Sequence, residues 1–274
     1  MSIIDEKYDK LIDFIKPLKS VIVTYSGGVD STLLAKVCRL VLGKDNVLAL
    51  FANSPSRPES EMQEAKALAE EHDISYKIIE TNEINDEHYY HNPINKCYYC
   101  KKNLNEIFYN VYNQEEKYKY ILNGTNAEDY GSFRPGIKSD KEYNIISPLA
   151  EIGFNKDEIR EISRRLKLRT WDKPSKTCLA TRIPTGMEIT QEKLKQIEES
   201  EKVLINMGFE NVRVRHLGDT ARIEVPPENF LYLIQKERLG RIIETIKKIG
   251  FEFVSLDLEG YESGKMNKVK STIK

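Results

Sequence analysis

The residues from Ser26 to Ser31, which read Ser-Gly-Gly-Val-Asp-Ser, could bind an anion. They follow the apolar run Val21–Val23 and open a helical pattern that continues to Leu42. A strand, a tight glycine turn and a helix N-terminus should meet here, and the unpaired N–H groups of such a terminus favour negative charge. The spacing is neither that of a Walker A motif nor that of a dinucleotide fold. It predicts an anion-binding loop of another kind, the alternative being a glycine turn without a ligand.

Three of the four cysteines could bind a metal centre. Cys97 and Cys100 form a Cys-x-x-Cys pair, and Cys178 lies in the segment Pro-Ser-Lys-Thr-Cys-Leu-Ala. A disulfide framework is not expected in a reducing cytosol, whereas two thiolates at this spacing can chelate one metal centre. A [4Fe–4S] cluster held by three cysteines leaves one iron open to a further ligand. Cys38 instead falls on the apolar face of a helical pattern, and we expect it in the core.

Two other interpretations of these cysteines stay open. His88 and His91 precede Cys97, so a structural Cys2His2 zinc site is an alternative, although Pro93 interrupts the spacing. A redox dithiol of Cys97 and Cys100, unrelated to Cys178, is the other. The number and softness of the thiolate ligands favour the cluster.

The N-terminal half alternates helical and strand patterns. Apolar residues at helical spacing predict helices over 4–15, 31–42, 59–72, 103–112 and 155–166, the last capped by Asn155. Short apolar runs predict strands at 21–23, 47–52, 74–78, 118–122 and 143–146. Strands separated by helices imply an α/β fold with a parallel sheet, which binds ligands at the C-terminal ends of its strands.

The pattern changes after about residue 185. It predicts a long helix over 191–207, then strands at 212–215 and 221–225 around the turn Gly218-Asp219. Two helical patterns within 226–250 and a strand at 251–257 complete the chain. We therefore expect an α/β domain of residues 1–185 and a small α+β domain of residues 186–274.

Composition limits the partners. The 274 residues carry a net charge of −1, so no overall basic field favours nucleic acid. The charged N-terminus lacks the apolar core of a signal peptide, and no apolar run approaches the roughly 20 residues that cross a bilayer. We expect a soluble cytoplasmic protein, a homo-oligomer, without a membrane or nucleic-acid partner.

Two further segments carry polar candidates for a site. The loop 123–136 follows a strand, which favours a site wall over a plain acidic surface loop; its candidates are Asn126, Glu128, Asp129 and Arg134. Arg213 and Arg215 alternate along a strand and should share one face. They could clamp a substrate phosphate or form a solvated face. Glu201 and Glu224 are weaker candidates for metal or substrate contacts.

The loop 26–31 resembles the SGGxDS pyrophosphate loop (PP-loop) of ATP pyrophosphatases, which split ATP into AMP and pyrophosphate to adenylate a substrate. Nearly the whole chain resembles the LarE family, the ATP-dependent sulfur transferases of nickel-pincer nucleotide cofactor synthesis. The supporting motifs beyond that loop are Gly124–Asp129, Arg134–Gly136, Ser147–Leu149, Lys173-Pro174, Cys178–Ala180, Arg182–Pro184 and Val212–Arg215.

The resemblance implies the branch of the family and its cofactors. Members with only the position of Cys178 give up that sulfur and turn over once, whereas members with an added Cys-x-x-Cys bind a [4Fe–4S] cluster. This chain resembles the second group, with Cys97, Cys100 and Cys178 as cluster ligands. Glu262 departs from the family, which has an arginine there.

The resemblance also implies a mechanism. A small-molecule carboxylate, nucleotide-like in kind, attacks the α-phosphate of ATP, pyrophosphate leaves, and sulfide on the cluster or another sulfur donor then displaces AMP. The implied catalytic residues are Asp30, Ser31 and Cys178. The implied nucleotide and substrate contacts are Ser26, Gly27, Gly28, Asp30, Ser31, Ala52, Asn126, Asp129, Arg134, Arg213 and Arg215. Catalysis is then mainly positioning and charge neutralisation around Mg²⁺, with Asp30 as a metal partner or only a helix-start acid. The adenine should lie near Phe51, Ala52 and Asn53, at the end of the second strand.

Two other functions are alternatives to this sulfur transferase. A cluster-dependent tRNA thiolase combines a PP-loop with three cysteines, although this chain lacks a net positive charge and an RNA-binding addition. A non-enzymatic iron–sulfur or zinc carrier, with a regulatory ATP loop, is the other.

Overall fold

The computed structural model describes residues 2–130, 136–175 and 177–262. The chain forms two compact units. The first comprises Met1–Glu83 and Asn95–Lys176, and the second comprises Ile84–Ile94 and Thr177–Lys274. The domain boundary near residue 185 stays a prediction beside this division.

The first unit contains a four-stranded parallel sheet in the order β3-β2-β1-β4. Its strands are β1 (Val21–Tyr25), β2 (Val47–Asn53), β3 (Ser75–Glu80) and β4 (Tyr120–Asn123). In register, Val23 of β1 lies between Ala49 of β2 and Leu122 of β4. The chain winds outward from β1 through β2 to β3 and then returns to the other side of β1. The switch point therefore lies between β1 and β4, where open α/β sheets bind their ligands. The predicted parallel α/β fold is confirmed.

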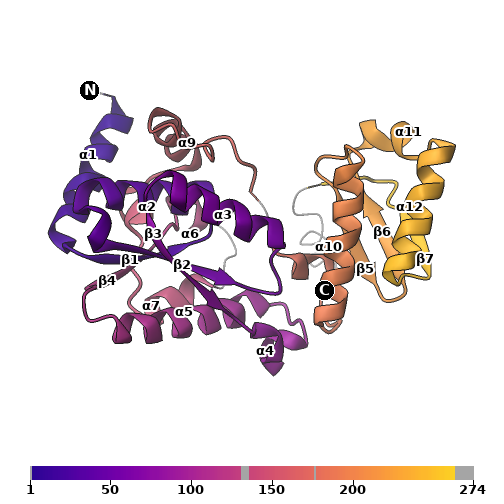
Figure 1. Ribbon diagram of the computed structural model, residues 1–274, viewed down its shortest axis with the longest axis horizontal. Coiled ribbons are helices and arrows are strands. Elements are labelled where there is room, and N and C mark those ends of the chain that lie inside the picture. Colours follow the sequence, from indigo (N-terminus) through magenta and orange to yellow (C-terminus); the bar gives the residue numbers. More distant parts are fainter. Residues whose placement is uncertain (1, 131–135, 176, 263–274) are drawn as a thin grey trace. The chain divides into compact units, whose positions relative to one another are not determined.

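Helices cover both faces of this sheet (Figure 1). They are α1 (Ile3–Ile15), α2 (Val29–Leu42), α3 (Glu59–Glu71), α5 (Lys96–Gln114), α6 (Ala127–Tyr130), α7 (Ile137–Glu142), α8 (Pro148–Ile152) and α9 (Lys156–Arg165). Successive strand residues point to opposite faces, so Val21 and Val23 pack with α1, α2 and α9, whereas Ile22 packs with Phe108 of α5. Cys38 is fully buried in the first of these clusters, as predicted.

Two predicted elements differ from the structure. Residues 143–146 form no strand, because α7 ends at Glu142, Asn144 has a φ of +52° and α8 begins at Pro148. Only Ile146 bridges to the sheet, in parallel with Leu122. The helix predicted over 103–112 begins earlier, at Lys96, and therefore includes both cysteines of the Cys-x-x-Cys pair. The predicted cap of α9 is confirmed, since Asn155 and Glu158 form a reciprocal capping box.

The second unit contains a three-stranded sheet in the order β5-β6-β7. Its elements are α4 (Glu87–Tyr90), α10 (Gln191–Asn206), β5 (Arg213–Leu217), β6 (Thr220–Glu224), α11 (Phe230–Leu233), α12 (Lys236–Ile249) and β7 (Phe253–Leu256). β5 and β6 form the predicted antiparallel hairpin, and β7 pairs parallel to β6. Leu204 of α10 and Ile242 of α12 pack with Val214 and Ile223 in a separate core.

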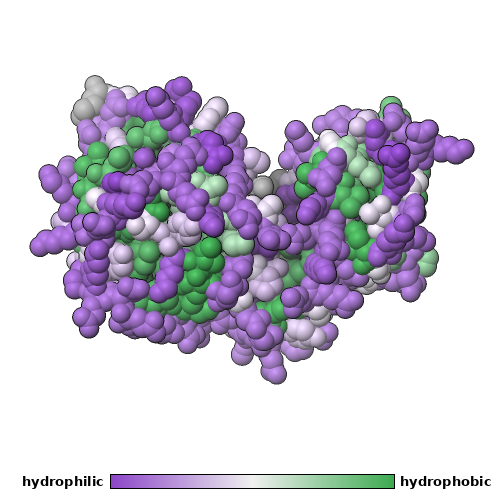
Figure 2. All heavy atoms as spheres, viewed as in Figure 1, coloured by the Kyte–Doolittle hydropathy of each residue, from purple (hydrophilic) through white to green (hydrophobic). Residues whose placement is uncertain are grey.

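The apolar side chains of both units gather mainly in these cores. In Figure 2 the visible face of each unit is mostly hydrophilic, with small separate apolar areas. Among the helices that the structure describes, none is long and apolar enough to cross a membrane.

Candidate functional site

The loop after β1 has a backbone that only glycine suits. Gly27 has a φ of +68°, and a Cβ atom on it would lie 2.6 Å from the Cβ of Ala65 in α3. Gly28 is the N-cap of α2, so the first N–H groups of this 14-residue helix begin at the loop. The hydroxyls of Ser26 and Ser31 lie 2.9 Å apart and tie the two ends of the turn. The strand, the tight glycine turn and the helix N-terminus expected from the sequence therefore meet in the first unit.

The loop after β4 lies directly against the start of α2. A Cβ atom on Gly124 would lie 2.7 Å from the backbone nitrogen of Ser31, so only glycine fits here as well. Asn126 donates through Nδ2 to a carboxylate oxygen of Asp30 at 3.5 Å, and its backbone N–H donates to Asp129 at 3.1 Å. The structure thus brings together the two loops that the sequence singled out separately.

Three cations beside the loop were not predicted from the sequence. The Nζ of Lys156, the first residue of α9, lies 2.5 Å from a carboxylate oxygen of Asp30. Lys173 donates to the carbonyl of Gly27 at 3.0 Å, and Arg57 donates to the carbonyl of Ser26 at 3.4 Å. The position of Arg57 in the sequence could have indicated its role, because it follows β2 at the edge where parallel sheets bind ligands. Lys173 stands in a motif that supported the family resemblance, although no role was assigned to it.

These groups line a pocket of about 360 Å³, a volume typical of small-ligand sites. The lining residues are Ser26, Gly28, Val29, Asp30, Arg57, Glu61, Asn126, Glu128, Asp129, Lys156, Lys173, Pro174 and Ser175. The cations and the start of α2 favour a polyanion, while the carboxylates offer oxygen ligands of the kind that Mg²⁺ prefers.

Two residues predicted to contact the nucleotide, Ala52 and Arg134, are not among the described residues that line this pocket. Ala52 is buried at the end of β2 within the apolar cluster of Ile22 and Phe108, and it does not line this pocket among the described residues. Its contact with adenine stays a prediction. Arg134 lies outside the described residues.

A buried carboxylate supports the loop after β4. Asp140 is 4% exposed and accepts hydrogen bonds from Asn105 and Asn123, both at 2.9 Å. The ammonium of Lys101 lies 3.3 Å from it. Asn123 in turn accepts from the backbone N–H of Thr125 at 3.0 Å. Asp140 therefore links the helix that begins with the Cys-x-x-Cys pair to the loop of the pocket.

The cysteines divide between the two units. Cys97 is exposed and Cys100 half-buried on the first turns of α5, and their separation of three residues places them on one helical face. Cys178 is half-buried in the second unit, as the N-cap of a short 3-10 turn, Leu179–Arg182. Within the described part of the chain, no group of three or more histidine, cysteine or acidic side chains is arranged to hold a metal ion. Two thiolates on one helical face could supply two of the ligands of a cluster or zinc site. Burial raises the pKa of the Cys38 thiol well above its usual range.

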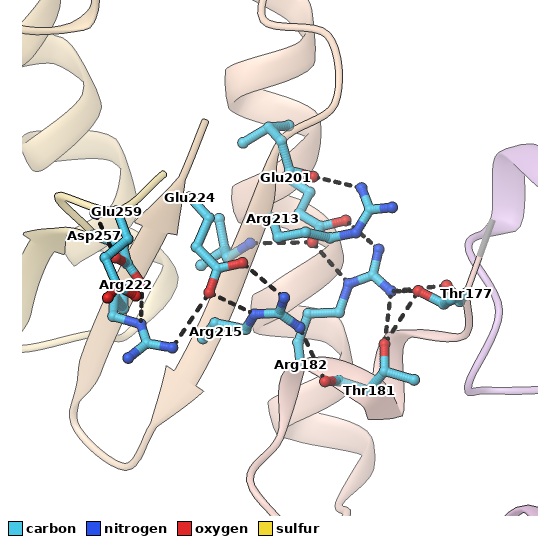
Figure 3. A network of polar contacts seen from close by, with 12 residues as sticks. Thr177, Thr181, Arg182, Glu201, Arg213, Arg215, Arg222, Glu224, Asp257 and Glu259 are labelled. Carbon is cyan, nitrogen blue, oxygen red and sulfur yellow. Dashed lines mark hydrogen bonds and ion pairs between the residues drawn. The ribbon is translucent and has the colours of Figure 1, made fainter. Parts of the chain in front are cut away.

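The candidate arginines of the second unit belong to a polar network (Figure 3). Arg215 is 6% exposed and makes two bonds to Glu224, at 2.9 and 2.7 Å. Arg182 makes a similar pair with Glu201. Glu201 and Glu224, considered above as metal or substrate ligands, are thus partners of buried arginines. The alternation along β5 gave no indication of this, because it says nothing of the residues across the hairpin.

Arg213 differs from its neighbour. Its guanidinium lies over the ring of Tyr261, 5.1 Å from the centroid, and donates to the carbonyl of Val212 at 2.7 Å. Burial and the nearby charge of Arg182 lower the pKa of Arg213. The carboxylate of Glu201 lies near enough to act in the opposite direction on this pKa, and among the described salt bridges none involves Arg213.

A parallel sheet with a Ser-Gly-Gly turn at its switch point, facing a pocket lined with cations, defines a PP-loop α/β protein. The family model for NAD synthase matches residues 8–128, which comprise this sheet, the Ser26–Ser31 loop and the start of the loop after β4.

The chain belongs to the LarE-like family of PP-loop proteins. It is 34% identical, over 97% of its length and 96% of the relative's, to the pyridinium-3,5-bisthiocarboxylic acid mononucleotide synthase of Lactiplantibacillus plantarum. It is 42% identical to an uncharacterized protein of Synechocystis, over 97% and 98% of the two chains. An uncharacterized protein of Methanocaldococcus jannaschii is 34% identical, over 89% and 92%.

Proposed function

We propose that this chain is an ATP-dependent sulfur transferase that adenylates a substrate carboxylate and then replaces one carboxylate oxygen by sulfur. The observation that carries the proposal is the pocket of the first unit, where the Ser26–Ser31 loop faces Arg57, Lys156 and Lys173. The second support is the L. plantarum relative, whose name describes the synthesis of a bisthiocarboxylic acid mononucleotide.

The pocket residues have distinct roles in this proposal. The N–H groups at the start of α2, with Lys173 and Arg57, bind the phosphates of ATP. Asp30, now paired with Lys156, would hold Mg²⁺, and the ammonium of Lys156 would then be available to a phosphate oxygen. The hydroxyls of Ser26 and Ser31 complete the loop. All of these groups act by placing and neutralising charge.

The first step forms an acyl-adenylate. A carboxylate oxygen of the substrate attacks the α-phosphorus of ATP, a P–O bond forms, and the bond to the β-phosphate breaks with loss of pyrophosphate. In the second step hydrosulfide attacks the acyl carbon and AMP leaves, so that a thiocarboxylic acid and AMP result. No electrons are exchanged in either step.

The cysteines supply the sulfur chemistry in this proposal. Cys97, Cys100 and Cys178 would hold a [4Fe–4S] cluster, and that group supplies an exchangeable sulfide when it is bound. Three thiolates without a fourth fit this role better than a structural zinc site, which is normally closed by four protein ligands. Arg213, whose guanidinium lies over the ring of Tyr261 and forms none of the described salt bridges, binds a phosphate of a nucleotide-like substrate. The homo-oligomer and the cytoplasmic location stay predictions.

The adenylation step is tested by the products from ATP and a nicotinate-derived dicarboxylate. The expected products are AMP and pyrophosphate, with no reaction on tRNA. Asp30→Ala and Ser31→Ala should each raise the activation free energy of pyrophosphate release by about 2–4 kcal/mol and so slow that release. Asp9→Ala, on the exposed surface of α1, is the control and should match the wild type. ADP as the main product would refute the assignment.

The cluster is tested by anaerobic purification. We expect a brown protein with about four irons and four sulfides per chain. Cys97→Ala, Cys100→Ala and Cys178→Ala should lose the absorption, whereas Cys38→Ala should keep it because that thiol is a core residue. A colourless protein loaded with zinc would contradict the proposal.

The source of the sulfur is tested by intact mass after reaction with ATP, acceptor and excess sulfide. If Cys178 only binds the cluster, its mass is unchanged after several turnovers. If Cys178 gives up its own sulfur, the chain loses about 34 Da as H2S and stops after one product. That second outcome would assign this chain to the single-turnover branch of its family.

A further inference from the structure

Arg182 is a buried guanidinium beside Cys178. It ends the 3-10 turn Leu179–Arg182 and is 3% exposed. Its Nε and Nη2 atoms bond the two carboxylate oxygens of Glu201 in α10, at 2.9 and 3.0 Å. This two-point pairing neutralises the buried charge and fixes the plane of the guanidinium against a 16-residue helix.

The third nitrogen of Arg182 faces the residues around Cys178 (Figure 3). Nη1 lies 2.7 Å from the carbonyl oxygen of Thr177 and 2.9 Å from the carbonyl oxygen of Cys178. It also lies within 3.1 Å of the hydroxyls of Thr177 and Thr181. Four oxygen atoms of the Cys178 turn therefore converge on one nitrogen that is anchored elsewhere.

The carbonyl of Cys178 is held from three directions. It accepts from the backbone N–H of Thr181 at 3.1 Å and from the hydroxyl of Thr181 at 2.8 Å, besides Nη1 of Arg182. Fixing this peptide fixes the direction in which the Cα–Cβ bond of Cys178 points. A lysine could not replace the guanidinium, because one ammonium cannot bond both oxygens of Glu201 and also reach the turn.

We propose that Arg182 is the positioning residue for Cys178: it transfers the rigidity of α10, through Glu201, to the peptide that carries the thiol. The proposal rests on the role of Cys178 proposed above. Arg182 itself touches no reacting atom. Its contribution is confined to the second unit, and the pocket for ATP in the first unit does not depend on it.

The test is site-resolved alkylation of the full-length, metal-free protein by iodoacetamide, read by peptide mass spectrometry. Arg182→Lys keeps the charge but loses the link to the turn, so we expect Cys178 to react several-fold faster. Cys97, in the same molecule, should keep its wild-type rate. Arg222→Lys is the matched control, since Arg222 also pairs with buried acids, Glu224 and Asp257, and none of its described hydrogen bonds or ion pairs is to Thr177, Cys178 or Thr181.

Two results would overturn the proposal. One is a folded Arg182→Lys protein, by circular dichroism, in which Cys178 reacts at the wild-type rate. The other is an equal change at Cys178 in Arg222→Lys. If Arg182→Lys does not fold, Thr181→Val decides instead. That variant keeps the pair with Glu201 and removes one hydroxyl from the carbonyl of Cys178, and it should give a smaller increase at Cys178 alone.

A second measurement separates this role from the proposed function. Arg182→Lys should release pyrophosphate at the wild-type rate while the yield of thiocarboxylic acid falls at least tenfold. A merely structural role would lower both together. If the wild-type protein releases no pyrophosphate, the proposed function fails, but the alkylation result still decides whether Arg182 positions Cys178.

Discussion

At the scale of single residues, two of the cations that line the candidate pocket form ion pairs with carboxylates. Lys156 neutralises Asp30, and Lys173 lies 2.9 Å from Glu64 while it bonds the loop. Such pairs keep cations and carboxylates close together, and in the proposed function a polyanion and a metal ion would replace the partners of Lys156 and Asp30. Removal of one partner therefore affects the other as well.

Lys156→Ala tests this arrangement. The variant loses a phosphate ligand and leaves Asp30 unpaired, so its carboxylate repels the incoming phosphates. We expect the dissociation constant of ATP to rise about 10- to 100-fold, which corresponds to roughly 1.5–3 kcal/mol for a charged hydrogen bond. Isothermal titration calorimetry measures it. Lys77→Ala, which removes an exposed pair with Glu115, should bind ATP normally; an unchanged constant for Lys156→Ala would place the nucleotide elsewhere.

His216 should make the stability of the second unit depend on pH. Burial lowers its pKa from 6.5, so below about pH 6.5 the unfolded chain binds a proton that the folded chain does not. The free energy of unfolding should therefore fall as the pH drops from 7.5 to 5.5. The slope for one such group is at most about 1.4 kcal/mol per pH unit.

Urea unfolding at several pH values measures this effect. His216→Gln should show a shallower slope than the wild type, because one contributor is gone. The pKa of His72 is also lowered by burial, so part of the slope remains. His88→Gln, whose side chain is 68% exposed, is the control and should keep the full slope. Equal slopes in His216→Gln and the wild type would contradict the argument.

The sequence identified the residues of the PP-loop but not the side chains that come to it from elsewhere. Ser26 to Ser31 are adjacent in the chain, so their types and spacing contain the whole signal. Lys156 and Lys173 reach the loop only because α9 and the segment after it return to the sheet edge. Likewise, the alternation of Arg213 and Arg215 predicted a shared face, whereas the partner of Arg215 depends on the register of the hairpin, in which Arg215 pairs with Arg222.

At the scale of elements, β1, α2 and α3 meet at Gly27, where no Cβ atom has room. Gly27→Ala should destabilise the protein by about 2–4 kcal/mol, from its positive φ and from the clash with Ala65. It should also abolish pyrophosphate release, because the loop would have to move away from α3. Urea unfolding and the product assay measure the two effects.

Gly240→Ala is the matched control for this change. Gly240 lies within α12, has no positive φ, and would carry a Cβ atom in open space, with no neighbouring atom within 4 Å. The same substitution should stabilise the protein there by about 0.5–1 kcal/mol, since alanine favours helices. The two substitutions should therefore change the free energy of unfolding in opposite directions. An unchanged stability of Gly27→Ala would show that the loop tolerates a side chain.

Long elements with regular apolar spacing were predictable, and short or aromatic-rich ones were not. The bounds of α9 and α10 followed from periodicity, and for α9 also from the capping residue Asn155. The start of α5 was missed because its first turns contain two cysteines and two tyrosines, which have modest helix propensity. The apolar run at 143–146 predicted a strand, but the adjoining helices leave too few extended residues for one.

At the scale of the whole molecule, the segment Ile84–Ile94 belongs to the second unit although it lies between β3 and α5 in sequence. Asn92 attaches it there. Its side-chain nitrogen donates to the carbonyls of Ile183, Pro184 and Met187, at 3.2, 2.7 and 3.0 Å. No local pattern indicated this attachment, because it joins residues about 90 positions apart.

Substitutions of Asn92 test its contribution. Asn92→Ala removes a donor from three carbonyls, of which that of Pro184 keeps the N–H of Met187, and places alanine at a φ of +52°. We therefore expect a loss of about 3–5 kcal/mol in the free energy of unfolding. Asn92→Gly loses the same donors without the backbone cost and should be about 1–2 kcal/mol more stable than the alanine variant. Urea denaturation compares them; equal stability of all three proteins would show that the side chain is dispensable.

The same segment sets an order of events during translation. Residues 84–94 leave the ribosome well before their partner Ile183, which lies 91 positions after Asn92. At about 5–20 residues per second, the segment waits roughly 5–18 seconds for that partner to be made. During this interval the segment between β3 and α5 lacks the hydrogen-bond partners of Asn92. The chain of the first unit, which ends at residue 176, is therefore complete before the segment inserted into it can form its bonds with Ile183, and chaperones and proteases have that interval in which to act on it.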